Sequence, residues 1–123
     1  MNLQTNLIGA SNVEPFKELL NMNEIEAFVL NHKLAFLFIS KPNCSVCHSL
    51  LPQIKTVMKQ YPQIKTACVN TDHVPEIAGR YNIFTVPVLI LFYQGKEYLR
   101  EARFVRIAPF NEKIKRIVDG VNN

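Results

Sequence analysis

The chain has 123 residues, 48% of them hydrophobic and 10% aromatic, which is typical of one globular domain with a sizeable core. Its longest apolar runs are about seven residues, too short for the roughly 20 that a membrane-spanning helix needs, so we expect no membrane association. The net charge of +4 comes from 14 basic and 10 acidic residues spread along the chain, and without a basic stripe we expect no nucleic-acid partner.

Residues 1–13 are polar and contain several asparagines, and we expect them to form a leader of uncertain structure ahead of one domain over residues 14–123. The first residues, MNLQTNLIGA, have neither the basic start nor the apolar core of a signal peptide. The expected location is therefore cytoplasmic, a compartment in which free thiols stay reduced.

The first elements of the domain alternate between helical and strand periods. Residues 16–20 are predicted to form a short strand or a helical turn. Asn23 and Glu26 have the spacing of a capping box, and we expect a helix from there to about Asn31. Residues 34–40, LAFLFIS, are apolar on both faces, which is typical of a central parallel strand covered on both sides.

A cysteine motif follows this strand. Residues 44–47, CSVC, come directly before a helical pattern of apolar residues that ends ahead of Tyr61. Pro52 lies inside the pattern and is expected to kink the helix. A short strand is predicted over residues 65–70 and a brief helix over residues 75–81.

The C-terminal part begins with residues 88–93, VLILFY, which are again apolar throughout. Gln94-Gly95 predicts a hairpin turn into a more mixed strand over about residues 98–105. Pro109 is expected to be the first residue of a closing helix, and Gly120 to end it. The order of elements, (β)αβαβαββα, predicts an α/β fold with a mixed sheet.

The segment Cys44-Ser45-Val46-Cys47-His48 is compatible with three kinds of chemistry: attachment of a c-type haem, half of a zinc site, or a redox dithiol. Haem attachment requires an exported protein. A zinc site needs four ligands. Cys44, Cys47 and His48 could be joined only by the distant Cys68 or His73, a set that the strand-to-helix setting does not favour. A redox pair suits cysteines at the start of a helix, where the helix dipole stabilises a thiolate. The sequence therefore favours a redox dithiol, with no metal and no cofactor.

Four features occur at mutually consistent spacings: a buried strand before the C-x-x-C, Pro52 eight residues after Cys44, the Val86-Pro87 dipeptide, and the Gly95 turn. With these features, the region from about residue 16 to residue 121 resembles the thioredoxin family. The resemblance implies a thioredoxin fold, with a mixed central sheet of about four or five strands flanked by helices on both faces. It also implies a cis peptide bond before Pro87, packed beside the dithiol.

The resemblance implies a thiol–disulfide oxidoreductase that reduces protein disulfides. Cys44 would attack the substrate disulfide, and Cys47 would resolve the mixed disulfide. The residues implied in substrate binding are Asn43, Thr85, Val86 and Pro87. Expected partners are proteins with disulfides and, as electron donor, a thioredoxin reductase or a small thiol; the chain is expected to be a monomer. The alternative is a non-enzymatic redox sensor or adaptor with the same fold.

Two departures from the family pattern concern the proton of Cys47. Counted along the chain, Phe38 and Cys68 fall where the family usually has a buried aspartate and a lysine. We therefore expect the usual acceptor of the Cys47 proton to be missing. Cys68 is either a third redox thiol or a small hydrophobic residue of the core.

Two further residues are candidate modulators of the site. His48 lies one helical turn after Cys44, and we expect a solvated surface histidine rather than a group that activates the thiol. Arg103 falls where the family has a glycine near the substrate groove. A long cation there is expected to favour disulfides flanked by acidic residues.

Overall fold

The structure, a computed structural model, describes residues 14–122, and the predicted leader over residues 1–13 lies outside this part of the chain. The strands are β1 (Lys17–Leu19), β2 (Leu34–Ser40), β3 (Lys65–Asn70), β4 (Val88–Tyr93) and β5 (Lys96–Ala102). The helices are α2 (Met22–Asn31), α3 (Ser45–Met58), α4 (Ile77–Tyr81) and α5 (Ile107–Val121). Within the described residues, no helix is both long and apolar enough to cross a membrane.

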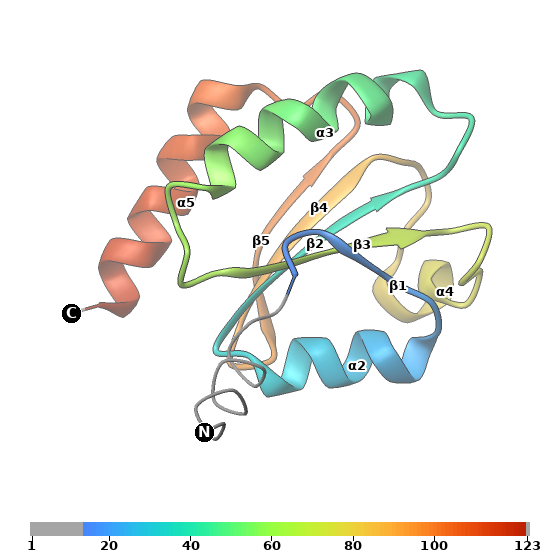
Figure 1. Ribbon diagram of the computed structural model, residues 1–123, viewed down its shortest axis with the longest axis horizontal. Coiled ribbons are helices and arrows are strands. Elements are labelled where there is room, and N and C mark those ends of the chain that lie inside the picture. The colour runs from blue at the N-terminus through green and yellow to red at the C-terminus, as the bar shows by residue number, and fades with distance from the viewer. Residues whose placement is uncertain (1–13, 123) are drawn as a thin grey trace, which may run out of the picture.

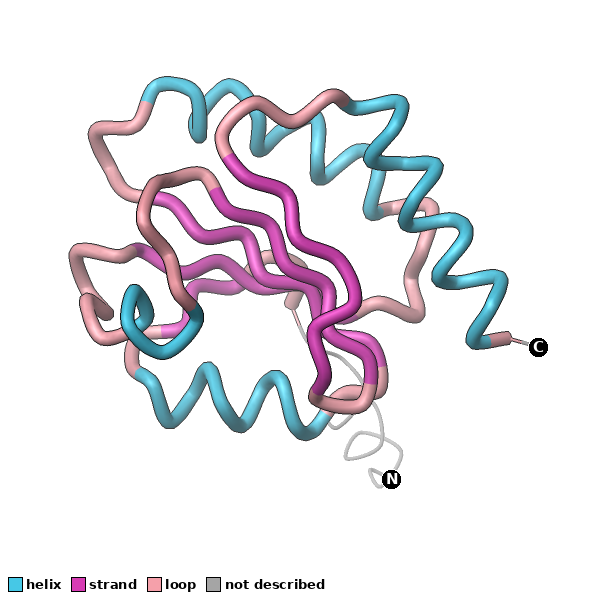
Figure 2. The backbone as a smooth tube through the Cα atoms, turned by 180° about the vertical axis from the view of Figure 1, so that it is seen from behind, coloured by secondary structure: helices cyan, strands magenta, loops and turns pink. Residues whose placement is uncertain are grey.

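The five strands form one mixed sheet in the order β1-β3-β2-β4-β5. β3 pairs parallel with both β1 and β2, whereas β4 pairs antiparallel with β2 and with β5. Helices α2 and α4 lie on one face of the sheet, and α3 and α5 lie on the other (Figure 1). The view from behind shows the same three layers (Figure 2). The predicted α/β fold, with a mixed sheet and helices on both faces, is confirmed.

Strand β2 lies at the centre of the sheet and contributes to two separate cores. Leu37 and Ile39 pack in the cluster on the α2 side, while Phe36 and Phe38 pack in the cluster beneath α3 and α5. These four side chains are at most 1% exposed. Burial on both faces explains why the strand is apolar at successive positions rather than at alternate ones.

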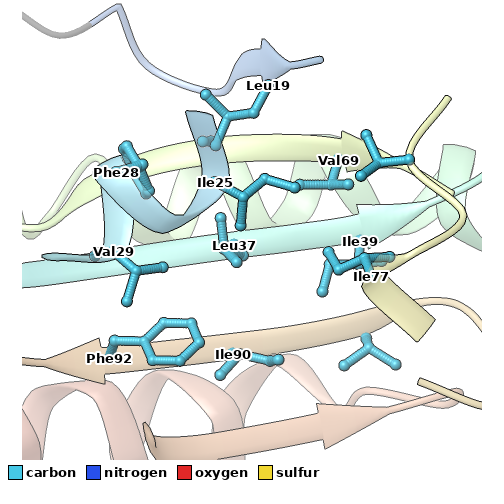
Figure 3. Close-up of a cluster of buried hydrophobic side chains, with 14 of the residues drawn as sticks. Leu19, Ile25, Phe28, Val29, Leu37, Ile39, Val69, Ile77, Ile90 and Phe92 are labelled. Carbon is cyan, nitrogen blue, oxygen red and sulfur yellow. The ribbon is translucent and has the colours of Figure 1, made fainter. Parts of the chain in front are cut away.

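Helix α2 covers its face of the sheet with residues at helical spacing. Ile25, Phe28 and Val29 point toward Leu37 and Ile90 of the central strands (Figure 3). The positions i, i+3 and i+4 lie on one side of a helix, so this spacing gives α2 a single apolar face.

The predicted capping box at Asn23 and Glu26 is wrong. The N-cap of α2 is Asn21, whose Oδ1 accepts a hydrogen bond of 2.9 Å from the backbone N–H of Glu24. Asn21 and Glu24 have the same spacing as Asn23 and Glu26, so the sequence offers two possible starts for the helix. The helix uses the earlier one, and Met22 in its first turn then packs against the core.

Strand β5 begins and ends earlier in the chain than the strand predicted over residues 98–105. Gln94 and Gly95 have φ angles of 51° and 81°, as in a type I′ turn, so the returning strand pairs immediately after the turn. Arg103 has a φ of 67° and leaves the extended conformation, which ends the strand.

The ends of α5 also differ from the prediction. The helix begins at Ile107, so Pro109 is its third residue rather than its first. A proline is tolerated there because the N–H groups of the first turn have no acceptor within the helix. At the other end the helix continues past Gly120 to Val121. The general position of α5 is as predicted, and only its boundaries are shifted.

Candidate active site

Cys44 and Cys47 lie where β2 leads into α3, and they form a disulfide with their Cα atoms 5.3 Å apart. Cys44 is half-buried and lines a groove on the surface. Cys47 is in the first turn of α3, only 2% exposed, and packs in the core beneath that helix. A partner molecule can therefore reach the sulfur of Cys44 but not that of Cys47.

Cys44 is the N-cap residue of α3, a position that favours a negative charge on its sulfur. Its backbone is extended, and its Sγ accepts a hydrogen bond of 3.2 Å from the backbone N–H of Cys47. The first N–H groups of a helix have no acceptor within the helix, and the positive end of the helix dipole lies there. In the reduced protein these groups are placed to stabilise a thiolate at Cys44, and a thiolate is the form of cysteine that takes part in disulfide exchange.

The loop ahead of β4 forms another wall of the groove. The peptide bond between Val86 and Pro87 is cis, as the resemblance implies. Thr85, Val86 and Pro87 line the groove, and so does Asn43 on the side of the dithiol. The groove is open and has a volume of about 710 Å³. All four residues predicted for substrate binding thus lie around the same groove as Cys44.

His48 is bonded to the loop ahead of α3 rather than to the sulfur of Cys44. Its Nε2 lies 2.6 Å from the carbonyl oxygen of Pro42. A carbonyl oxygen only accepts hydrogen bonds, so Nε2 carries the proton in this contact. The ring is at the surface, as expected, and its contact fastens the loop that positions Cys44.

Phe38 and Cys68 lie beneath the dithiol, directly opposite each other on β2 and β3. Phe38 is a member of the core cluster that contains Cys47, and Cys68 packs against it. Phe38 has no group that takes a proton. Burial raises the pKa of the Cys68 thiol to about 11, so Cys68 remains a neutral thiol near pH 7. Neither side chain is therefore a useful acceptor for the Cys47 proton.

Tyr61 is a further titratable side chain in this core, and burial raises the pKa of its phenol, so it is no better an acceptor. No carboxylate, histidine or lysine side chain of the described residues is buried there. Thr66 is the only buried polar residue among them, so every described carboxylate is at least partly exposed to solvent. Residues 14–122 also contain no group of three or more His, Cys, Asp or Glu residues that could hold a metal ion. The zinc ligand set that can be written from the sequence does not assemble in this part of the chain.

Cys68 is expected to react slowly with alkylating agents. In a Cys44→Ser/Cys47→Ser variant it is the only one of the chain's three cysteines that remains. Because its pKa is about 11 instead of 9.0, its thiolate fraction at pH 8 should be roughly 100-fold below that of an ordinary thiol. Iodoacetamide labelling followed by mass spectrometry measures this rate. The same variant unfolded in urea is the control. Equal labelling rates in the folded and unfolded states would contradict the raised pKa of Cys68 in the folded protein.

Five residues of the groove were not predicted as site residues from the sequence, namely Lys41, Ser45, Val46, Phe84 and Phe104. Phe84 is 90% exposed and Phe104 is 82% exposed. Arg103, which was predicted, also lines the groove. Their positions in the sequence could have indicated the two phenylalanines, because Phe84 directly precedes the predicted substrate-binding loop and Phe104 directly follows Arg103.

Comparisons with known proteins agree with this geometry. The thioredoxin family model matches residues 16–117. The thioredoxin-like protein YdfQ of Bacillus subtilis is 52% identical over 93 residues, which cover 76% of this chain and 83% of YdfQ. Among solved structures, thioredoxin from Fasciola hepatica superposes with a TM-score of 0.74 at 21% identity, covering 82% of this chain and 98% of that one. Thioredoxin from Trypanosoma brucei brucei gives 0.76 at 15% identity, covering 85% and 91%.

Proposed function

Because the chain belongs to the thioredoxin family and is a thiol–disulfide oxidoreductase, we propose that it reduces disulfides of protein substrates, with Cys44 as attacking thiol and Cys47 as resolving thiol. The observation that supports this division of roles is the difference in exposure between the two sulfurs. Cys44 lines the groove, whereas Cys47 is 2% exposed in the core. A disulfide within a protein substrate is too bulky to reach the buried sulfur of Cys47.

The reaction consists of two exchange steps. The Cys44 thiolate attacks one sulfur of the substrate disulfide, a Cys44–substrate disulfide forms, and the other substrate sulfur leaves as a thiolate that takes a proton from water. Cys47 then loses its proton and attacks the sulfur of Cys44, which releases the second substrate thiol. The substrate gains two electrons, and the protein is left with the Cys44–Cys47 disulfide seen in the structure.

The loop that contains the cis-proline is the proposed docking edge for the substrate. Thr85 is exposed and Val86 is half-buried beside Cys44 in the groove. Backbone groups of such a loop can pair with an extended segment of the target. Asn43 faces the same groove from the side of the dithiol and is proposed as a further contact.

The proposed setting is the cytoplasm, where a monomer accepts electrons from a thioredoxin reductase or a small thiol. The reduction potential of the Cys44–Cys47 pair tests the direction of electron flow. A value near about −270 mV would fit a reductase, whereas one near about −120 mV would make the protein an oxidant.

Reduction of insulin, driven by dithiothreitol or by NADPH with a thioredoxin reductase, tests the proposed function. We expect many turnovers per protein molecule. The Cys44→Ser/Cys47→Ser variant is the control and should give only the background rate. A protein that is oxidised once but does not turn over with either donor would instead be a redox sensor, the alternative considered from the sequence.

A further inference from the structure

Large apolar side chains exposed to water are concentrated around the groove beside Cys44. Among the described residues, six such side chains are exposed, and the two most exposed are Phe84 at 90% and Phe104 at 82%. Both line the groove, together with the exposed Val46. Apolar surface gathered at one functional site marks a place where a partner is bound.

The two phenylalanines come from different loops that are tied together. Phe84 precedes the cis-proline loop, and Phe104 lies between β5 and α5. The backbone N–H of Arg103 donates a hydrogen bond of 2.9 Å to the carbonyl oxygen of Pro87, which joins these loops next to the groove. Phe104 also borders a smaller hollow with Val46. The two rings therefore come from loops joined by this hydrogen bond and line the same groove as Cys44.

The charges of the groove have a single sign. Lys41 and Arg103 line it, and none of its described lining residues is acidic. Arg106 lies just beyond, in the hollow that Phe104 borders. Within residues 14–122, neither Lys41 nor Arg103 forms an ion pair with a carboxylate. The groove therefore presents uncompensated positive charge to whatever docks there.

Building on the proposed reductase function, we propose that the groove selects extended protein segments in which the disulfide cysteine is flanked by a large apolar residue and by an acidic residue. The apolar side chain would remove Phe84 or Phe104 from water, a gain proportional to the area that both partners bury. The carboxylate would meet Arg103 or Lys41, and complementary charge chiefly speeds encounter and disfavours basic partners.

A set of matched peptides tests this selectivity. Each is an extended decapeptide whose single cysteine carries a thionitrobenzoate group, so that attack by Cys44 releases a coloured thiolate. The four peptides combine a phenylalanine or an alanine beside the cysteine with an aspartate or a lysine nearby. Every kcat/KM is divided by the value that the same variant gives with hydroxyethyl disulfide, which has neither side chain.

We expect the peptide with phenylalanine and aspartate to react about tenfold faster than the peptide with alanine and lysine. Phe84→Ala and Phe104→Ala should each lower the preference for phenylalanine about threefold to fivefold. Arg103→Gln should lower the preference for aspartate by a similar factor and reduce its dependence on salt. Glutamine is chosen rather than glycine because a glycine would also relax the backbone at φ 67°.

Two control variants lie away from the groove. Leu30→Ala removes a side chain that is 72% exposed at the end of α2, and Lys96→Gln removes a cation at the start of β5. Neither should change the preference among the peptides. Thermal melts of every variant check that the fold is retained, as expected for substitutions of exposed residues.

The outcomes separate this inference from the proposed function. Equal rates for all four peptides, with hydroxyethyl disulfide still reduced, would overturn the selectivity and leave the reductase function standing. Failure to reduce any disulfide would overturn both. A wild-type protein that sedimented as a dimer, with Phe84→Ala or Phe104→Ala monomeric, would assign the apolar surface to a second copy of the chain and so contradict the proposal.

Discussion

Replacing Cys47 by serine is expected to turn the protein from a catalyst into a trap for its substrates. Cys44 remains at the helix N-terminus, where the N–H of residue 47 faces its sulfur, so the first exchange step still occurs. The second step has no thiol to carry it out. We expect turnover to fall on the order of 100-fold or more, while mixed disulfides accumulate.

Non-reducing gels and mass spectrometry measure the trapped species after incubation with an oxidised protein substrate. The matched control is Cys44→Ser, which removes the sulfur that lines the groove and should trap nothing. If Cys44→Ser formed the mixed disulfide and Cys47→Ser did not, the roles of the two cysteines would have to be exchanged.

The mixed disulfide of the wild-type protein is expected to persist at low pH and to disappear quickly at high pH. Cys47 must lose its proton in a site that is 2% exposed, and desolvation disfavours the charged thiolate. Phe38 cannot accept this proton, and Cys68 is a neutral thiol with a pKa of about 11. Resolution then depends on hydroxide or solvent, so its rate should rise up to about tenfold per pH unit between roughly pH 6 and 9.

Rapid quenching with acid, followed by mass spectrometry, measures the lifetime of the mixed disulfide at each pH. Phe38→Asp should shorten it near neutral pH by supplying an acceptor, although a lone buried carboxylate should lower the free energy of unfolding by about 3 kcal/mol or more. Phe38→Leu is the matched control, since it changes the packing without adding an acid. A lifetime that did not vary with pH would mean that another group takes the proton.

The sequence predicted the parts of the fold that depend on long apolar patterns. β2 and β4 are apolar at nearly every position because both of their faces are covered, and their bounds agree with the prediction. The location of the dithiol could also be predicted, since a C-x-x-C that directly follows a buried strand lies at the start of the next helix. The pattern of burial therefore carried most of the information about the architecture.

The element boundaries were predicted less well because each depends on a choice that neighbouring packing decides. Asn21 and Asn23 are both followed by a glutamate three residues later, and only the tertiary structure selects the first. The end of β5 depends on Arg103, a residue type that gives no warning of a positive φ. In both places tertiary contacts that the local sequence does not reveal decide the boundary.

The aromatic part of the groove could not be predicted from residue type. A phenylalanine in a globular chain is normally a core residue, and Phe36, Phe38, Phe92 and Phe110 are indeed buried. Phe84 and Phe104 are the exceptions, and only their positions next to the predicted substrate-binding loop and next to Arg103 distinguish them in the sequence. Their exposure depends on where two loops meet in space, which only the assembled sheet defines.

The strand order also determines when the groove can exist during synthesis. β2 pairs with β3 on one side and β4 on the other, so the part of the chain through β3 holds the dithiol but none of the opposing loops. In a chain that extends only through α4, one edge of β2 is unpaired, and the groove residues 84–87, 103 and 104 are not yet present beside Cys44. The hairpin of β4 and β5 thus pairs the open edge of β2 and brings the loops on either side of it to the groove.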